Sequence, residues 1–381
     1  MYSNITIGLI FEALKLYYYI LIFLFSFVTT WLIIPLIRAV ILKNRLIQQP
    51  NSRSSHQHRV PSFGGLAFFL VLIIGILITP EIIEKVFNDS EFGYIKSLIM
   101  RASLTLALII TVYTGIKDDN KILTPKNKLF GQFVSACLIA YFDKFRINNF
   151  YGLFNVYELP LFLSLIFSII FIVCIMNAFN LIDGIDGNAA LNGICISFFF
   201  CLFFFVTKSM FFVSICIMLI GILTAFMRFN FSASRKIFMG DTGSLTVGLV
   251  ISVLALRTLN IQEHEFELNF LEYNNIPIIV FTILLLPILD VIRVIIIRLK
   301  LKKRIWKPDR NHIHHLLIDI GFTHKKASLT INLILLLFNS SVILALSTFG
   351  TIFGLIIIIV FIISSIIYLN YIDNNFPKSD M

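Results

Sequence analysis

The chain has 381 residues, of which 58% are hydrophobic and only 14% are charged. Soluble domains are about 45–50% apolar and about 25% charged, and a chain of this length could not bury so much apolar surface in water. The composition excludes a soluble or disordered protein and predicts an all-α polytopic membrane protein. The net charge of +10 is then expected to reflect loop topology rather than nucleic-acid binding.

Eleven apolar runs approach the roughly 20 residues that a helix needs to cross the hydrocarbon. They lie near residues 17–37, 64–83, 98–116, 128–145, 159–178, 189–206, 209–227, 242–257, 276–298, 328–346 and 350–369. The fourth is the weakest, because its apolar core from Leu129 to Phe142 is short. The first lacks a basic n-region and a small-residue cleavage site, so we expect a retained span. Together the runs predict one integral membrane domain over residues 1–381.

The loops between these runs differ in charge. The loops after the first, third, seventh and ninth runs carry twenty-one of the Lys and Arg residues, whereas the opposite loops carry six, together with four glutamates between residues 263 and 272. The positive-inside rule places the basic loops and the C-terminus in the cytoplasm and the N-terminus outside. We therefore expect a multi-pass protein of the cell inner (plasma) membrane.

Every dense polar motif falls in a loop that this topology places in the cytoplasm. In chain order the motifs are His56-x₄-Pro61-x₂-Gly64-Gly65, Asp118-Asp119 followed by Lys128, Asn177-x₂-Asn180-x₂-Asp183-Gly-x-Asp186-Gly, Met-Gly-Asp241-x-Gly243-Ser244 and Arg310-Asn-His312-x-His314-His315. Unpaired carboxylates at the edge of hydrocarbon are costly, so they need a cation, a base partner or water. Carboxylate and amide oxygens suit Mg²⁺, which typically takes one or two protein carboxylates and completes its shell with water and substrate phosphates.

Other features of these motifs suit a phosphate-containing ligand. Asn177, Asn180 and Asp183 are spaced to share one face at a helix end. The turn at 240–244 offers backbone N–H groups to anions at the start of a helix. Arg310 and the histidines add cationic donors for a diphosphate. These residues predict phosphoryl transfer at the inner membrane surface.

Several other interpretations stay open at this point. The Asp-Asp pair and the DGxDG segment are also typical of solvated turns. The basic segment Lys300–Arg304 is also typical of an anchor to anionic lipid, and the His-x-His-His spacing is also typical of a zinc site. Asp290 has Arg293 three residues on, and a structural intrahelical ion pair and a catalytic role are equally open for it. The competing functions are a cation-coupled transporter, whose site would lie near the membrane midplane, and a membrane scaffold.

The five motifs in this order, over about residues 53–315, resemble those of the polyprenyl-phosphate N-acetylhexosamine-1-phosphate transferases of glycosyltransferase family 4. The match is to the bacterial WecA-like branch, with MraY as a more distant relative. The resemblance implies transfer of an N-acetylhexosamine-1-phosphate, with GlcNAc-1-phosphate first in line, from a UDP-sugar to undecaprenyl phosphate. On this resemblance UMP would be released, and the product would initiate a cell-envelope polysaccharide. The implied cofactor is Mg²⁺, with Mn²⁺ as a substitute, and a homodimer is an open option.

The resemblance also implies roles for individual residues. Asp241 and Asn180 would bind the metal, and Lys128 would be the charge partner of the acidic pair. The remaining catalytic positions would be Asp118, Asp119, His312, His314 and His315, and the substrate-binding positions would be Asp183, Asp186, Arg310, His56, Asn177, Gly243 and Ser244. We favour direct in-line attack with Asp118 or Asp119 orienting or deprotonating the acceptor. A covalent aspartyl-phosphate route stays open beside it.

Three departures from the family pattern bear on the sugar rather than on the reaction. Ser62 and Phe63 stand where relatives often have Arg-x before the glycine pair, so one cation is missing. Asn188 stands where Leu is usual after the second Asp-Gly. The opening at residues 53–56 resembles branches that take donors other than UDP-GlcNAc. The identity of the hexosamine and the pathway are left open.

Overall fold

The structure is a computed structural model that describes residues 2–44, 60–87, 94–142, 145–152, 155–266, 271–300, 302 and 312–375. All regular structure in these ranges is helical. The helices are α1 (Tyr2–Lys43), α2 (Gly65–Phe87), α3 (Tyr94–Asn120), α4 (Pro125–Tyr141), α5 (Leu161–Ile182), α6 (Asn188–Val206), α7 (Met210–Asn230), α8 (Gly240–Thr258), α9 (Ile276–Lys300), α10 (Ile313–Asp319), α11 (His324–Thr348) and α12 (Thr351–Asn375), with 3₁₀ turns at Glu263–Glu265 and Tyr273–Asn275.

Each of the eleven predicted spans corresponds to a helix, which confirms the all-α membrane fold. Ten helices in the described ranges are long and apolar enough to cross a bilayer. The exception is α4, whose 17 residues reach about 25 Å at 1.5 Å per residue. Helix α1 is far longer than the predicted run, because apolar content marks the membrane-embedded part of a helix and not its ends. The seven-residue helix α10 was not predicted, since so short a helix leaves no periodic pattern.

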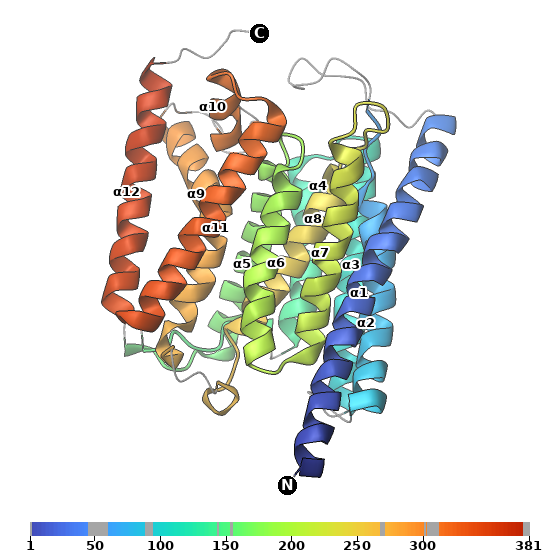
Figure 1. Cartoon of the computed structure of the whole chain (residues 1–381). Coiled ribbons are helices and arrows are strands. Elements are labelled where there is room, and N and C mark those ends of the chain that lie inside the picture. The colour runs from blue at the N-terminus through green and yellow to red at the C-terminus, as the bar shows by residue number, and fades with distance from the viewer. Residues whose placement is uncertain are drawn as a thin grey trace.

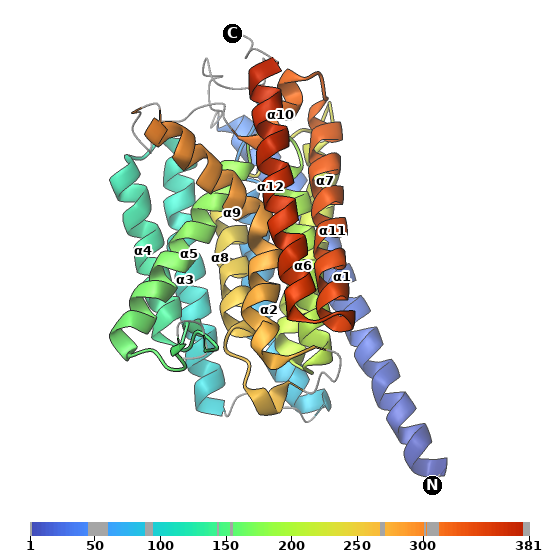
Figure 2. The same cartoon turned by 90° about the vertical axis from the view of Figure 1, so that its left-hand side faces the viewer.

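The long helices alternate in direction, and the two chain ends lie at opposite ends of the bundle (Figure 1). Helix α8 is central and packs against α2, α3, α5, α6 and α9, whereas α1 lies along α7, and α11 and α12 pair at the other edge (Figures 1 and 2). Because α8 faces protein rather than lipid, it tolerates hydroxyl side chains. Thr246 and Thr258, for example, donate to carbonyls one turn back at 2.6 and 3.0 Å.

Close helix packing fixes the start of α8. Gly115 near the end of α3 lies against the backbone of Thr242, and a Cβ at Gly115 would be 2.6 Å from Thr242 N. Real Cβ atoms do not approach a neighbouring backbone so closely, so any side chain at 115 would push α3 and α8 apart. The two helices therefore meet in backbone contact beside the polar motifs.

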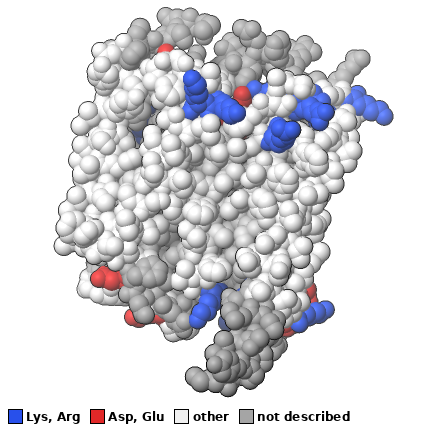
Figure 3. Space-filling view, viewed as in Figure 1, with Lys and Arg blue, Asp and Glu red and all other residues white. Residues whose placement is uncertain are grey.

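Charge is distributed unevenly over the two ends of the bundle. In the view of Figure 3, Lys and Arg gather along the upper rim, where α8 begins and α12 ends, whereas the lower rim carries both acidic and basic side chains. The upper end is also the end at which the polar motifs lie.

Candidate active site

Lys128 is the centre of a polar cluster at this end of the bundle. Thr124 caps α4 by accepting from Asn127 N, and Pro125 occupies the first helical position, so Lys128 projects from the first turn. The Lys128 ammonium lies 3.0 Å from Asp118 Oδ2 and 2.9 Å from Asn180 Oδ1, and it also pairs with Asp241 Oδ2. Three oxygens from α3, α5 and α8 thus surround one cation.

Asn180 links the metal-ligand candidates to each other. Its Nδ2 donates to Asp241 Oδ1 at 2.8 Å and to Ser244 Oγ at 3.0 Å, while its Oδ1 accepts from Lys128. One turn earlier, Asn177 forms a reciprocal amide pair with Gln132 of α4, at 2.7 and 3.3 Å. Both asparagines therefore face the α4 side, as the predicted shared helix face requires, and the Asn177 amide is held by Gln132.

Asp119 caps the N-terminus of α8. Its Oδ1 accepts from Asp241 N at 2.9 Å, and its Oδ2 accepts from Thr242 N at 3.0 Å and from Thr242 Oγ1 at 2.6 Å. Gly240 has a φ of 70°, and a Cβ there would be 2.6 Å from Asp119 Oδ2, so only glycine leaves room for the carboxylate. The two neighbouring aspartates thus have different contacts. The Asp118 carboxylate pairs with Lys128, whereas the Asp119 carboxylate accepts hydrogen bonds from the backbone at Asp241 and Thr242.

The anion expected at the start of α8 is therefore Asp119 itself. Gly243 and Ser244, predicted to bind substrate, are fully buried in the protein. Gly243 lies against Gly65 of α2, and Ser244 accepts the hydrogen bond from Asn180. The sequence pattern correctly indicated an anion-binding helix start, but a carboxylate from α3 fills it.

Asp183 is the C-cap residue of α5 and begins the turn that leads to α6. Burial, and next the charges of Asp241, Asp119 and Asp186, raise the pKa of Asp183 well above its usual range. Among the described residues no hydrogen bond or ion pair to its carboxylate is formed. An aspartate in such surroundings favours binding of a proton or an external cation.

Asp186, at the other end of this turn, pairs with Lys236 and lies near His324. Lys236 Nζ lies 2.6 Å and His324 Nδ1 lies 3.5 Å from its Oδ2. The turn backbone is fixed by Asn230 Oδ1, which accepts from Gly187 N at 2.6 Å, and by the Ser328 hydroxyl, which donates to Asp186 O at 2.6 Å.

Asn188, where a Leu is usual, is part of this support. It starts α6, is buried, and donates to Ile182 O at 2.9 Å, which joins the end of α5 to the start of α6 across the turn. Ser62 and Phe63, the other departure, are buried too. The predicted site residues His56 and Arg310 lie outside the described residues.

The three predicted histidines lie together at the start of α10, beside the same turn. The rings of His312 and His314 are stacked, with centroids 5.5 Å apart, and those of His314 and His315 are 4.3 Å apart. His314 is 1% exposed and its Nε2 lies against Gly184, in the turn between Asp183 and Asp186. Burial is the main cause that lowers the pKa of His314 to about 3, so this ring is neutral at physiological pH.

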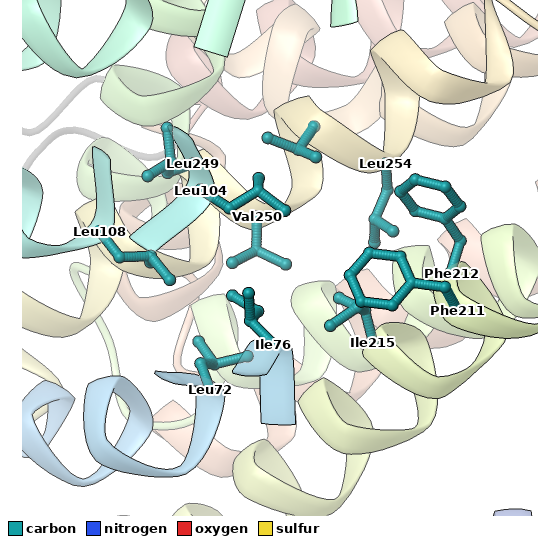
Figure 4. A pocket seen from close by; sticks show the side chains of 11 residues that line it. Leu72, Ile76, Leu104, Leu108, Phe211, Phe212, Ile215, Leu249, Val250 and Leu254 are labelled. Carbon is teal, nitrogen blue, oxygen red and sulfur yellow. The ribbon is translucent and has the colours of Figure 1, made fainter. Parts of the chain in front are cut away.

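A separate cavity lies deeper in the bundle between α2, α3, α7 and α8. Its lining is wholly apolar, with Leu72, Leu108, Ile215 and Val250 among the side chains (Figure 4). Phosphoryl transfer needs groups that neutralise charge. This cavity offers none, and the polar end of the bundle is therefore the candidate active site.

The chain is similar to known proteins over most of its length. Residues 101–259 match the sequence model of glycosyl transferase family 4. A probable undecaprenyl-phosphate N-acetylglucosaminyl 1-phosphate transferase of Bacillus subtilis (strain 168) is 31% identical over 323 residues, which cover 84% of this chain and 83% of the relative. The chain belongs to glycosyl transferase family 4.

Other members of family 4 are similar over most of their length. The undecaprenyl-phosphate alpha-N-acetylglucosaminyl 1-phosphate transferase of Escherichia coli (strain K12) is 29% identical over 334 residues, 85% of this chain and 83% of that protein. A decaprenyl-phosphate N-acetylglucosaminephosphotransferase of Mycobacterium leprae (strain TN) is 27% identical over 77% of this chain and 75% of its own. The resemblance inferred from the motifs is thus confirmed, and the transporter alternative finds no support.

Some contacts of this family 4 site were not predicted from the sequence. Gln132 pairs with Asn177 and lies one helical turn after Lys128, so its position on the site-facing side of α4 was a usable signal. Lys236, assigned only to membrane topology, pairs with Asp186. Asp290 contacts His312, a partner that its spacing from Arg293 did not suggest.

The donor atoms around Lys128 fit a hard divalent cation. Asp118, Asn180 and Asp241 contribute only oxygens, and these oxygens already converge on the positive charge of Lys128. Within the described ranges, no group of three or more His, Cys, Asp or Glu residues has a geometry that could hold a metal. A site of one carboxylate and one amide from the protein, completed by substrate phosphate and water, is the pattern that Mg²⁺ prefers.

Proposed function

We propose that this protein transfers N-acetylhexosamine-1-phosphate, with GlcNAc-1-phosphate as the first expectation, from a UDP-sugar to undecaprenyl phosphate. The acceptor phosphate oxygen forms a bond to the β-phosphorus of the donor while the bond to the bridging oxygen breaks and UMP leaves. The observation that carries the proposal is the convergence of Asp118, Asn180 and Asp241 on Lys128 at the polar end of the bundle. The names of the relatives support undecaprenyl phosphate as the acceptor and N-acetylglucosaminyl 1-phosphate as the transferred group.

In this proposal Asp241 and Asn180 hold Mg²⁺, whose bound charge would neutralise the transferring phosphoryl group. Lys128 lies beside them and supplies a second positive charge for the diphosphate. Asp183, whose carboxylate has no partner among the described residues, faces the same negative neighbours and is suited to contact the cation or its water shell.

The geometry divides the acidic pair between two tasks. Both oxygens of Asp119 accept hydrogen bonds from the start of α8, so Asp119 positions Asp241. Asp118 is the residue left to orient or deprotonate the acceptor, and its Oδ2 lies 3.0 Å from the Lys128 ammonium. An acceptor phosphate is already largely ionised near neutral pH, which supports direct in-line attack rather than a covalent intermediate.

The active site is proposed to face the cytoplasm. The upper rim in Figure 3 carries most of the visible Lys and Arg side chains, and basic loops are retained on the cytoplasmic side. This orientation gives the site access to UDP-sugars and to the phosphate of a lipid in the inner leaflet of the plasma membrane. This orientation is tested in intact cells by the accessibility of cysteines introduced at Lys126 and at Tyr157, which lie at opposite ends of the bundle.

The reaction is tested with purified protein in detergent, undecaprenyl phosphate, Mg²⁺ and a panel of UDP-N-acetylhexosamines. We expect release of UMP that depends on the lipid, stops with EDTA, and occurs with one donor. Asp241→Asn should abolish it, whereas Glu81→Gln, which changes a carboxylate paired with Arg101 far along α2, should not. Absence of UMP with every donor from folded protein would contradict the proposal, as would equal activity of Asp241→Asn.

A further inference from the structure

A buried carboxylate outside the Lys128 cluster contacts the histidine segment. Asp290 lies within α9 and is 2% exposed. Its Oδ2 is 2.6 Å from His312 Nδ1, and its Oδ1 accepts from Ile313 N at 2.8 Å. One carboxylate therefore holds both a histidine ring and the first N–H of α10.

This contact replaces a missing helix cap. His312 is the N-cap residue of α10, and its own side chain makes no capping hydrogen bond. The first N–H groups of a helix need an acceptor, and a negative charge there is favourable. Asp290 supplies both from a neighbouring helix, so the position and direction of α10 depend on it.

The contact also selects the proton position on His312. An ionised carboxylate can only accept, so His312 Nδ1 must carry a proton, and Nε2 is the nitrogen left for another partner. The His312 ring stacks on His314, which lies against Gly184 in the turn that holds Asp183 and Asp186. Asp290 thus fixes the orientation of the His312 ring, which belongs to the predicted diphosphate side of the site.

We propose that Asp290 is a positioning residue for the transferase reaction: it fixes the Nδ1-protonated form of His312 and orients α10 so that Nε2 serves the donor diphosphate. The inference rests on the proposed function. An asparagine at 290 has nearly the same shape as the aspartate but no charge. It keeps an oxygen for Ile313 N but turns an N–H₂ toward His312 Nδ1. Nδ1 must then become the acceptor, and the proton moves to Nε2.

The kinetic test compares Asp290→Asn with wild type in the UMP assay. We expect kcat to fall at least about ten-fold, as when a carboxylate that orients a functional histidine is removed, with KM for the donor and the unfolding temperature nearly unchanged. Glu81→Gln is the matched control, since it also neutralises an ion-paired carboxylate, 2.9 Å from Arg101. In a double-mutant cycle, adding Asp290→Asn to His312→Gln should cause no further loss. A kcat within two-fold of wild type, or losses that multiply, would overturn the proposal.

A second measurement needs no activity. In ¹⁵N-histidine-labelled protein, the His312 signals, assigned by their loss in His312→Gln, should report a protonated Nδ1 in wild type and a proton on Nε2 alone in Asp290→Asn. A bare Nδ1 in the wild-type protein overturns the proposal even if Asp290→Asn does not fold. If the wild-type protein releases no lipid-dependent UMP, the proposed function fails, while this measurement still decides whether Asp290 sets the histidine.

Discussion

Asp119→Asn is expected to destabilise the protein by loosening the start of α8. The wild-type carboxylate accepts three hydrogen bonds, from Asp241 N, Thr242 N and Thr242 Oγ1. Asparagine has one acceptor oxygen, so at least one backbone N–H would face an N–H₂ group. A hydrogen bond to a charged group contributes about 1.5–3 kcal/mol, and a buried unsatisfied donor costs about 1–3 kcal/mol. Easier burial of the neutral amide offsets part of this loss, which leaves about 2 kcal/mol, or about thirty-fold in the unfolding equilibrium.

Equilibrium unfolding in mixed micelles of a mild detergent and SDS measures this change. Thr242→Val removes only the hydroxyl bond and should cost about 1 kcal/mol. Ser252→Ala is the control on the same helix. Among the described residues its hydroxyl bonds only to Leu249 O, at 2.7 Å within α8, so its stability should stay within about 0.5 kcal/mol of wild type. Asp118→Asn should abolish UMP release with a smaller loss of stability, since its Oδ1 can still accept from Leu123 N. If the Asp119→Asn protein were as stable as the Ser252→Ala protein, the capping role of Asp119 would be refuted.

Three further outcomes follow from the geometry. Burial and neighbouring carboxylates raise the pKa of Asp183, so this group ionises at a lower pH in the unfolded chain than in the folded protein, and the free energy of unfolding should fall as pH rises above the ordinary aspartate value of about 3.9. Asp183→Asn should reduce that fall and stabilise the EDTA-treated protein at neutral pH. A pH dependence of unfolding that is the same in the variant and the wild type would contradict this. Lys302→Ala should leave kcat within two-fold, because Lys302 is exposed after α9, and a loss like that of Asp118→Asn would show that it serves the reaction. Gly115→Leu should lower both unfolding temperature and activity by separating α3 from Thr242, and near-wild-type values would mean that this contact is dispensable.

The sequence was sufficient to predict the membrane architecture because lipid requires long apolar helices regardless of their partners. The prediction of membrane spans was weakest for α4, which has only 17 residues, and for α8, which is buried in protein and carries hydroxyls that bond to its own backbone carbonyls. The meeting of Lys128, Asn180 and Asp241 was also predictable, because their motifs all stand at helix ends on one predicted face.

Partner choice within the site could not be read from spacing. Asp118 and Asp119 are adjacent in sequence, yet only the approach of α8 to α3 decides that Asp119 binds its backbone. Lys236 reaches Asp186 across 50 positions of the chain, and His312 reaches Asp290 across 22. Such contacts depend on how helices pack, which a single sequence does not specify.

The dependence of α8 on its neighbours has a consequence for biogenesis. It is the least apolar of the ten candidate spans, and it brings Asp241 into the membrane edge. An isolated helix with that carboxylate would pay a penalty in lipid, and the two groups that bind the carboxylate, Lys128 of α4 and Asn180 of α5, both precede it in the chain. By the time a ribosome delivers α8 to the insertion machinery, this cation and this hydrogen-bond donor are already in place. We therefore expect α8 to leave that machinery only after docking against α3–α5, so deleting these helices should strand α8 outside the bilayer.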